Sequence, residues 1–408
     1  MYEAAYVDIY QTGYFPKIRK VDYKGMYNAI EITANISPET TKIVKYIDYD
    51  EDGFKYEKHG SFILYYVPDK RINKTVVIAV NNAFDGVLKI KLKEIREKRF
   101  EIKQAMKTCT EEERAILESQ QVGLKVVANI PSGYNGQATA RWGDIAVSIL
   151  TVGIGRLLIR DTIRYIEAKY GNHTITDTNL KRTDRSKFKV CVEVDTDGIY
   201  VCEDIDVKDL NHYLENRVKE LLGVEESEMQ LDFEKFGAGY FIKMKTYILQ
   251  ELDEHNEASE HFTIHGGGLK GSKVPPCFDI TLNRLIKCIL SGKGDIKKEI
   301  NECLDIKRYS IKELSLGLTL NKEPNTYLEG SQQAKLIRQS EAIGEPARLG
   351  TQFDYVKSRD GYTFSHLIQS IDEIDCRYYE ATLIRLMEKL GLTEQLRAKD
   401  TDSVDEWA

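Results

Sequence analysis

The chain lacks the sequence signatures of several special protein classes. Its 408 residues include only 8 Pro and 7 Cys, and no two cysteines are spaced as Cys-x-x-Cys. This excludes a disulfide framework and a zinc ribbon. The 28 Gly are scattered, which excludes a collagen or low-complexity chain. The most apolar stretch, residues 145–154, falls short of the ~20 residues of a membrane span. With no signal-peptide pattern at its start, the chain is expected in a reduced cytoplasmic compartment without membrane contact.

The chain also has no overall excess of basic residues. It contains 58 Lys and Arg against 65 Asp and Glu, which gives a net charge of −7. Taken alone, that sum argues against a nucleic-acid partner. The charge is unevenly distributed, however, because residues 89–107 hold eight Lys or Arg and only three Glu. A solvated helix face and an anion-binding face both remain open for this segment.

Hydrophobic periodicity predicts a β-rich N-terminal part that is interrupted by a helical hairpin. Strands are expected at residues 4–10, 16–23, 61–67 and 75–80, where Tyr, Val and Ile recur. Between residues 85 and 128 the apolar period becomes helical. Thr110 and Glu113 form a capping box, which predicts the start of the second arm of the hairpin.

The rest of the chain is expected to turn from mixed to mostly helical structure. A glycine-bearing loop is expected at residues 131–136, before a long apolar helix at 142–169. Asp-Gly between two alternating runs at 189–202 predicts a β-hairpin. Later helices are expected at residues 282–290, 296–304, 333–341 and 378–390. His261 and His265 precede a Gly run and are expected in a loop without metal.

Two aspartate positions have the right context for metal chemistry. Asp22 follows a hydrophobic strand pattern, and Asp195 and Asp197 lie at the tip of the β-hairpin. Carboxylates at neighbouring strand ends can hold two Mg²⁺ ions ~3.5–4 Å apart for phosphoryl transfer. The alternative is that each aspartate serves only its turn. A similar tripeptide at residues 400–402 lies in a polar tail without strands, so its context excludes a metal site.

Seven segments resemble, in order along the chain, the motifs of the family B DNA polymerases. The segments are residues 2–7 (YEAAYV), 21–30 (VDYKGMYNAI) with 35–40 (NISPET), 121–129 (QVGLKVVAN), 192–201 (VEVDTDGIYV), 241–247 (FIKMKTY), 269–271 (LKG) and 371–379 (IDEIDCRYY). Each match is weak alone, but their order and their spread over the chain make them specific together.

The resemblance implies an α+β fold of the right-hand polymerase type. An antiparallel sheet would form the palm, a helical hairpin inserted in the palm would form the fingers, and a mostly helical segment would form the thumb. The expected boundaries are residues 1–84 for the first part of the palm, 85–128 for the fingers, 129–275 for the second part of the palm, and 276–408 for the thumb and tail.

The resemblance also implies roles for residues that match the motifs. Asp22 and Asp197 would bind two Mg²⁺ ions, for which Mn²⁺ can substitute, with Asp195 as a nearby acid. Tyr27 would lie under the deoxyribose of the incoming dNTP. Three cations would bind its triphosphate, namely Arg99, Lys103 and Lys125, with Arg96 or Lys107 as alternatives if the helix register shifts. Asn129 would lie near the new base pair, and the DNA contacts would come from Gly133, Tyr134, Lys245, Tyr247 and Lys270.

The chain departs from the family pattern at several positions. Ser132 stands where the family has a Tyr in its second motif, which puts fidelity in doubt. Gly198 replaces a Ser, and Thr246 replaces a basic residue. Only 21 residues precede Asp22, so the proofreading exonuclease domain is expected on a separate polypeptide of a split enzyme, or to be lost.

The resulting expectation is a DNA-templated DNA polymerase core that adds dNTPs to a primer 3′-hydroxyl on primer-template DNA. Its expected location is the nucleoid, or the host cytoplasm for a phage-encoded chain. The alternative is a non-catalytic, polymerase-like DNA-binding or assembly subunit. A reverse transcriptase is disfavoured because Asp195 and Asp197 are not adjacent. The acidic tail at residues 401–408 contains Trp407, and it is either a solvated tail or a docking segment for a sliding clamp or another replication partner.

Overall fold

The computed structural model describes residues 2–137, 139–177, 179–269 and 274–396. Its contacts divide the chain into two compact units. The N-terminal unit comprises residues 1–11 and 17–236, and the C-terminal unit comprises residues 12–16 and 237–408. Each unit has its own hydrophobic core. No helix in the described ranges is long and apolar enough to cross a membrane.

A five-stranded antiparallel sheet forms the centre of the N-terminal unit. Its strand order is β1 (Val7–Ile9), β8 (Cys191–Asp195), β9 (Gly198–Val201), β3 (Ile18–Tyr23) and β10 (Leu231–Phe236). The predicted strands around Asp22 and the predicted β8–β9 hairpin are confirmed. In this register Asp22 lies opposite Gly198. The two segments predicted to bind metal, residues 21–30 and 192–201, therefore meet at adjacent strands.

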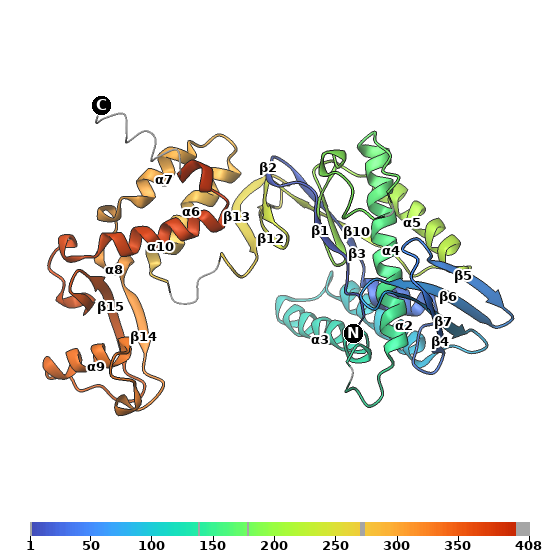
Figure 1. Ribbon diagram of the computed structural model, residues 1–408, viewed down its shortest axis with the longest axis horizontal. Coiled ribbons are helices and arrows are strands. Elements are labelled where there is room, and N and C mark those ends of the chain that lie inside the picture. Colours follow the sequence, from blue (N-terminus) through green and yellow to red (C-terminus); the bar gives the residue numbers. More distant parts are fainter. Residues whose placement is uncertain (1, 138, 178, 270–273, 397–408) are drawn as a thin grey trace. The chain divides into compact units, whose positions relative to one another are not determined.

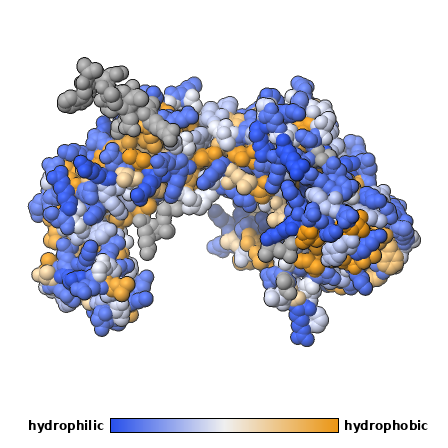
Figure 2. All heavy atoms as spheres, in the orientation of Figure 1, coloured by the Kyte–Doolittle hydropathy of each residue, from blue (hydrophilic) through white to orange (hydrophobic). Residues whose placement is uncertain are grey.

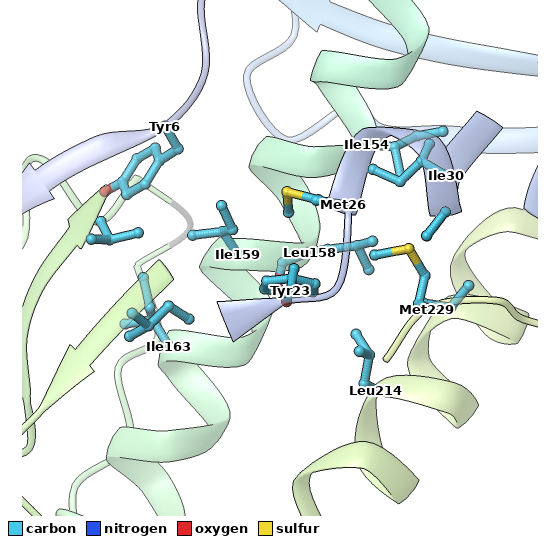
Figure 3. Packing of buried hydrophobic residues seen from close by; sticks show 14 of the residues in the cluster. Tyr6, Tyr23, Met26, Ile30, Ile154, Leu158, Ile159, Ile163, Leu214 and Met229 are labelled. Carbon is cyan, nitrogen blue, oxygen red and sulfur yellow. The ribbon is translucent and has the colours of Figure 1, made fainter. Parts of the chain in front are cut away.

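The long helix α4 (Ile145–Tyr170) packs against this sheet and confirms the predicted apolar helix. Figure 3 shows Leu158, Ile159 and Ile163 of α4 beside Tyr23 of β3. The buried Tyr23 hydroxyl lies 2.6 Å from the Thr162 hydroxyl and 3.2 Å from the carbonyl oxygen of Leu158. Helix α5 (Val207–Leu222) adds its apolar stripe to the same core.

A buried carboxylate joins α4 to the start of β8. The fully buried Glu167 accepts hydrogen bonds from the backbone N–H groups of Lys189, Val190 and Cys191, at 3.0, 3.1 and 2.7 Å. Buried N–H groups without an acceptor destabilise a folded protein. The carboxylate of Glu167 accepts from three such groups at residues 189–191, where the chain enters β8.

A second sheet of four antiparallel strands packs on another side of α4 (Figure 1). Its order is β4 (Thr41–Asp48), β7 (Lys74–Asn81), β6 (Phe62–Asp69) and β5 (Lys55–His59). The strands expected at 61–67 and 75–80 are confirmed, whereas β4 and β5 were not predicted. Figure 2 shows hydrophobic residues at the surface of the N-terminal unit. The exposed large side chains of this unit include Val44 and Tyr46 of β4 and Val87 of α2.

The predicted helical hairpin is confirmed as α2 (Val87–Ala105) and α3 (Glu111–Asn135), with the capping box at Thr110. Its base packs on α1 (Met26–Thr33) through the buried cluster of Ile32, Leu92 and Ala128. The prediction of a loop at residues 131–136 was wrong, because α3 continues through Pro131 to Asn135.

Hydrogen bonds of Asn135 support the end of α3 beyond Pro131. The buried Asn135 donates to the carbonyl oxygen of Pro131 at 3.0 Å and accepts from the backbone N–H of Asp144 at 3.1 Å. These bonds fix the last turn of α3 to the segment that leads into α4. They outweigh the low helix propensity of proline.

The C-terminal unit combines a sheet with helices. The sheet order is β13 (Ala258–His265), β12 (Thr246–Leu252), β11 (Gly239–Lys243) and β2 (Gly13–Phe15). His261 and His265 therefore lie in a strand, so the loop expected there was wrong. A helical core follows, formed by α6 (Pro276–Leu290), α7 (Ile296–Leu304), α8 (Ile311–Leu314) and α10 (Cys376–Lys389).

A small sheet within this unit was not predicted. Strands β14 (Leu316–Thr319), β15 (Gln352–Ser358) and β16 (Gly361–Phe364) pair in that order and pack against α9 (Gln332–Ala342). The C-terminal region is thus less uniformly helical than its sequence suggested. Short 3-10 helices complete the unit and the region before β8, at Arg185–Lys187, Ile306–Arg308, Pro324–Thr326, Ser365–Leu367 and Ile371–Glu373.

We predict that Glu167→Ala lowers the free energy of unfolding by about 3 kcal/mol or more, because three buried N–H groups lose their acceptor. Urea denaturation followed by circular dichroism measures this change. The control is Glu215→Ala, which removes an exposed partner of Lys219 on α5 and should cost only about 0.5 kcal/mol. Equal losses in the two variants would contradict the role assigned to Glu167.

Candidate active site

Asp22 and Asp197 come together at one end of the central sheet. Asp22 is the penultimate residue of β3, and Asp197 lies in the turn between β8 and β9. The backbone N–H of Tyr23 donates to the carbonyl oxygen of Asp197 at 2.9 Å, which fixes the two segments side by side. Burial, and then the charge of Asp22, raise the pKa of Asp197 above its ordinary value. The site is therefore arranged so that two like charges lie close together.

Lys20 offsets part of that repulsion and was not predicted from the sequence. Its Nζ lies 2.8 Å from Oδ1 of Asp22. Burial of the ammonium group opposes its charge, but the hydrogen bond and charge of Asp22, with Glu234 and Asp197, outweigh it and raise the pKa of Lys20. Lys20 lowers the pKa of Asp197 in turn. A lysine two residues before a strand aspartate shares its face of the sheet, a signal that the sequence did contain.

The departure at Gly198 is explained by Lys20. A Cβ atom at residue 198 would lie 2.7 Å from Cε of Lys20 and 3.2 Å from Oδ1 of Asp22. A larger residue would therefore displace the Lys20 side chain from Asp22. In this chain the glycine and the lysine occur as a compatible pair.

Asp195 lies close by in a less central position. It ends β8, and its Oδ1 accepts a hydrogen bond from the Thr196 hydroxyl at 3.1 Å. Thr196 has a φ of 66°, so the turn bends in the left-handed region. Of the causes that shift the pKa of Asp197, the charge of Asp195 is the smallest. The charges of Asp22 and Asp195 thus both raise the pKa of Asp197, and that of Asp22 contributes more.

The carboxylate pair fits the requirements of a hard divalent ion. Within the described part of the chain, no group of three or more His, Cys, Asp or Glu side chains could hold a metal by itself. Mg²⁺ in phosphoryl-transfer sites is commonly bound by one or two carboxylates, with water and substrate phosphates as further ligands. Asp22 and Asp197 match this requirement in number and in chemical type.

Tyr27 lies next to the carboxylate pair at the start of α1. A Cβ at Gly155 of α4 would come within 3.3 Å of its ring, so the absent side chain leaves space for the ring to pack on the helix. Burial, and then Asp197, raise the pKa of the Tyr27 hydroxyl to about 12, against the opposing charge of Arg156. The ring therefore has a fixed place between the acids and α4.

Three predicted phosphate-binding cations lie on the helical hairpin. Arg99 of α2 donates from Nη2 to Oε1 of Gln121 on α3 at 3.1 Å. Lys103 is one turn from Arg99, and Lys125 is one turn from Gln121. Burial and the charge of Arg96 lower the pKa of Arg99. Lys103 and Lys125 are exposed, and in the described ranges neither has a carboxylate within ion-pair distance.

The alternative cations proposed for a shifted register are placed differently. Arg96 donates to the backbone carbonyl of Glu228 at 3.2 Å and lies 3.5 Å from its carboxylate. Its charge is thus already compensated within the N-terminal unit. Lys107 follows the end of α2 in the connection to α3.

The segment from Asn129 to Ser132 contacts α1 through polar side chains. Asn28 donates to Oδ1 of Asn129 at 3.3 Å. The Ser132 hydroxyl donates to Oε1 of the fully buried Glu31 at 3.1 Å, and Oε2 of Glu31 has no partner among the described residues. Burial raises the pKa of Glu31 to about 7, although the Ser132 hydrogen bond lowers it. Ser132 therefore has a specific partner, which no pattern in the sequence indicated.

Of the residues predicted to bind DNA, two lie on the last turns of α3. Gly133 is exposed, and a Cβ there would meet no atom within 4 Å. The hydroxyl of the half-buried Tyr134 accepts a hydrogen bond from the backbone N–H of Trp142 at 3.2 Å. That bond holds the ring against the segment before α4.

Two more of the predicted DNA contacts, Lys245 and Tyr247, belong to the C-terminal unit. Lys245 lies in the turn between β11 and β12, with a φ of 59°. The Tyr247 ring is buried between Phe241 and His265, with ring centroids 5.2 and 4.5 Å away. This position favours a structural role, in which the ring supports the turn that holds Lys245. Lys270 lies outside the described residues, as do the tail residues 400–408.

Comparison with known proteins gives consistent matches. The model of "DNA polymerase family B" matches residues 2–361. The DNA polymerase of Desulfurococcus sp. (strain Tok) is 25% identical over 374 residues, which are 87% of this chain and 41% of that protein. The DNA polymerase of Archaeoglobus fulgidus is 23% identical over 98% of this chain and 45% of its own length.

Solved structures show the same fold. The family B DNA polymerase from Pyrobaculum calidifontis superposes with a TM-score of 0.61 at 19% identity, over 96% of this chain and 47% of that one. The chain thus spans about half the length of the relatives that it matches.

The raised pKa of the buried Glu31 predicts how the stability of the protein depends on pH. Its neutral form is stabilised in the folded state, so its contribution to stability is complete below pH 4.5 and is lost as the pH rises through about 7. We expect the stability of Glu31→Gln relative to the wild type to rise by roughly 3 kcal/mol between pH 4 and pH 8. Urea titrations at both pH values measure the difference.

The control for Glu31→Gln is Glu226→Gln, which changes an exposed glutamate. Its stability relative to the wild type should not change with pH. If the wild type and Glu31→Gln show parallel pH profiles, the buried carboxyl has an ordinary pKa and the expectation is wrong.

Proposed function

This chain belongs to DNA polymerase family B, and we propose that it extends DNA primers on a template by nucleotidyl transfer. The observation that carries the proposal is the pair Asp22 and Asp197. The two carboxylates lie at adjacent strand ends of an antiparallel sheet, beside the Tyr27 ring. The family relationship and the intact carboxylate pair together favour a catalytic chain over a non-catalytic DNA-binding subunit.

The chemistry proposed needs no covalent intermediate with the protein. Asp22 and Asp197 would hold two Mg²⁺ ions, or Mn²⁺ in their place, which would stabilise the charge that develops as the primer 3′-hydroxyl bonds to the α-phosphate and pyrophosphate leaves. The protein positions the substrates. Tyr27 forms a floor for the deoxyribose, and the exposed Lys103 and Lys125 can approach the triphosphate. Arg99 holds the two helices of the hairpin together through Gln121.

The modules follow as part of the proposal. We assign the central sheet with α4 to the palm, the α2–α3 hairpin to the fingers and the helical C-terminal region to the thumb. The contacts group residues 237–275 with the C-terminal unit rather than with the central sheet. This division at residue 236 concerns compactness alone, so the expected end of the palm at residue 275 stays a prediction.

Several proposed partners extend beyond the site. Primer-template DNA and dNTPs follow from the proposed reaction. The separate exonuclease subunit of a split enzyme and the sliding clamp stay predictions from the sequence, as does a phage or viral source.

The decisive test is primer extension with dNTPs and Mg²⁺. We expect Asp197→Asn to lower the rate by about a thousandfold, because one of the two protein ligands of the metals is lost. Asp204→Asn is the control, since Asp204 is an exposed carboxylate that pairs with Lys17 and Arg19. It should leave the rate unchanged.

Two outcomes would contradict the catalytic proposal. Undiminished extension by Asp197→Asn would show that the carboxylate pair is not the active site. Tight primer-template binding by the wild type without incorporation in Mg²⁺ or Mn²⁺ would identify a non-catalytic DNA-binding subunit.

A further prediction concerns the cations of the hairpin. Lys125→Ala should raise the KM for dNTP by about tenfold or more, since a charge-assisted contact to phosphate is lost. Arg96→Ala is the matched control, because Glu228 already holds that guanidinium. Steady-state kinetics on the two variants measure the effect. A larger rise in the KM for Arg96→Ala would show that the phosphate-binding cations of α2 lie one turn away from the proposed positions.

A further inference from the structure

A cavity of about 120 Å³ lies between α4, the second sheet and the segment before β8. We call it the α4 pocket. It lies within the N-terminal unit, and neither Asp22 nor Asp197 lines it. This volume is several times the ~10–15 Å³ that one water molecule needs, so a phosphate-sized group fits. Gly153 forms part of its wall, and a Cβ there would lie 2.4 Å from Val67 of β6. The missing side chain lets α4 approach the sheet closely.

The charges that line the α4 pocket are unbalanced. The lining includes five cations and two carboxylates, namely Lys70, Arg156, Arg160, Lys181 and Arg182 with Glu3 and Glu51. Both carboxylates already have partners. Glu3 lies 3.5 Å from Nη2 of Arg156, and Glu51 accepts from Asn179 and Arg182 at 2.6 and 3.3 Å.

Three cations remain without a carboxylate partner. Among the described residues, Lys70, Arg160 and Lys181 have no acid within ion-pair distance. Arg160 donates from Nε to the carbonyl oxygen of Arg156, and its two terminal nitrogens make no hydrogen bond with the described residues. Arg160 also lies near the buried Arg156, whose pKa falls through burial and through this like charge, with Glu3 opposing. An anion in the pocket would relieve this repulsion.

Aromatic rings lie beside the unpaired cations. Tyr6, Tyr49 and Phe54 line the same cavity. The Nζ of Lys181 lies 5.3 Å from the centroid of the Tyr6 ring. A surface that combines cations with aromatic faces suits a ligand that carries both a phosphate and a planar base, because bases stack on such rings.

We propose that the α4 pocket binds a nucleotide unit, with its phosphate on Arg160 and Lys181 and its base against the neighbouring rings. The unit can be a free nucleotide or an unpaired nucleotide of single-stranded DNA. Both sources present the same chemistry. The site is separate from the carboxylate pair, so it does not depend on the proposed catalysis.

The test measures binding without metal, so that the carboxylate pair takes no part. The probes are dAMP, followed by calorimetry, and a fluorescent single-stranded oligonucleotide, followed by anisotropy. The full chain is compared with Arg160→Ala, Lys181→Ala and the conservative Arg160→Lys. The control is Lys187→Ala, which changes an exposed lysine of the segment before β8 that does not line the pocket.

We expect Arg160→Ala and Lys181→Ala to weaken binding by about tenfold each, with Arg160→Lys between them and the wild type. Loss of dAMP binding alone identifies a free nucleotide as the ligand. If the pocket variants bind the oligonucleotide more weakly, and dAMP displaces the oligonucleotide from the wild type, the ligand is a DNA strand.

The proposal is overturned if neither probe binds the wild type, or if the pocket variants bind both probes as Lys187→Ala does. Primer extension by the same variants separates this result from the proposed function. Extension that persists while binding is lost leaves the polymerase assignment in place.

Discussion

The N-terminal unit depends on the burial of one helix, α4. Its apolar residues pack against the central sheet on one side, and the second sheet lies on another. Three polar contacts then fix the register of this packing. Tyr23 hydrogen bonds with α4 at Thr162 and Leu158, and Glu167 holds the backbone at the start of β8. Because β3 and β8 lead directly to the aspartates, the position of α4 determines where the carboxylates meet.

The carboxylate site at the end of the central sheet brings two negative charges together at an energetic cost. Two carboxylates on adjacent strand ends repel each other, and burial adds to the cost of ionising Asp197. Lys20 relieves part of this cost from the same face of β3, and Gly198 leaves the space that it needs. A divalent cation would provide the same compensation more strongly. The carboxylates are therefore poised for a positively charged ligand, with a lysine as the internal counter-ion.

The sequence predicted the elements whose periodicity is strong. The strand before Asp22, the β8–β9 hairpin, α2, α3 and α4 all carry regular apolar patterns, and each was found. The sequence failed where tertiary contacts decide. Pro131 suggested a loop, yet Asn135 and its partners keep the helix intact. The edge strand β4 leaves most of its residues exposed and so lacks a clear alternation. The resemblance to family motifs predicted that Asp22 and Asp197 lie close together. The buried Glu31 and the α4 pocket could not be predicted, because they depend on three-dimensional distances that residue spacing in the sequence does not specify.

The same helix also joins the two candidate sites. Gly155 lets the Tyr27 ring pack on α4, and Arg156, one residue later, donates to the backbone at Glu3 and Pro68 beside the pocket. The charge of Arg156 acts on Tyr27, which in turn lies near Asp197. The Arg156 guanidinium is buried and is held in place by these hydrogen bonds. An anion in the α4 pocket would weaken the field of Arg156 at Tyr27, so occupancy of the pocket would be felt electrostatically beside the carboxylate pair.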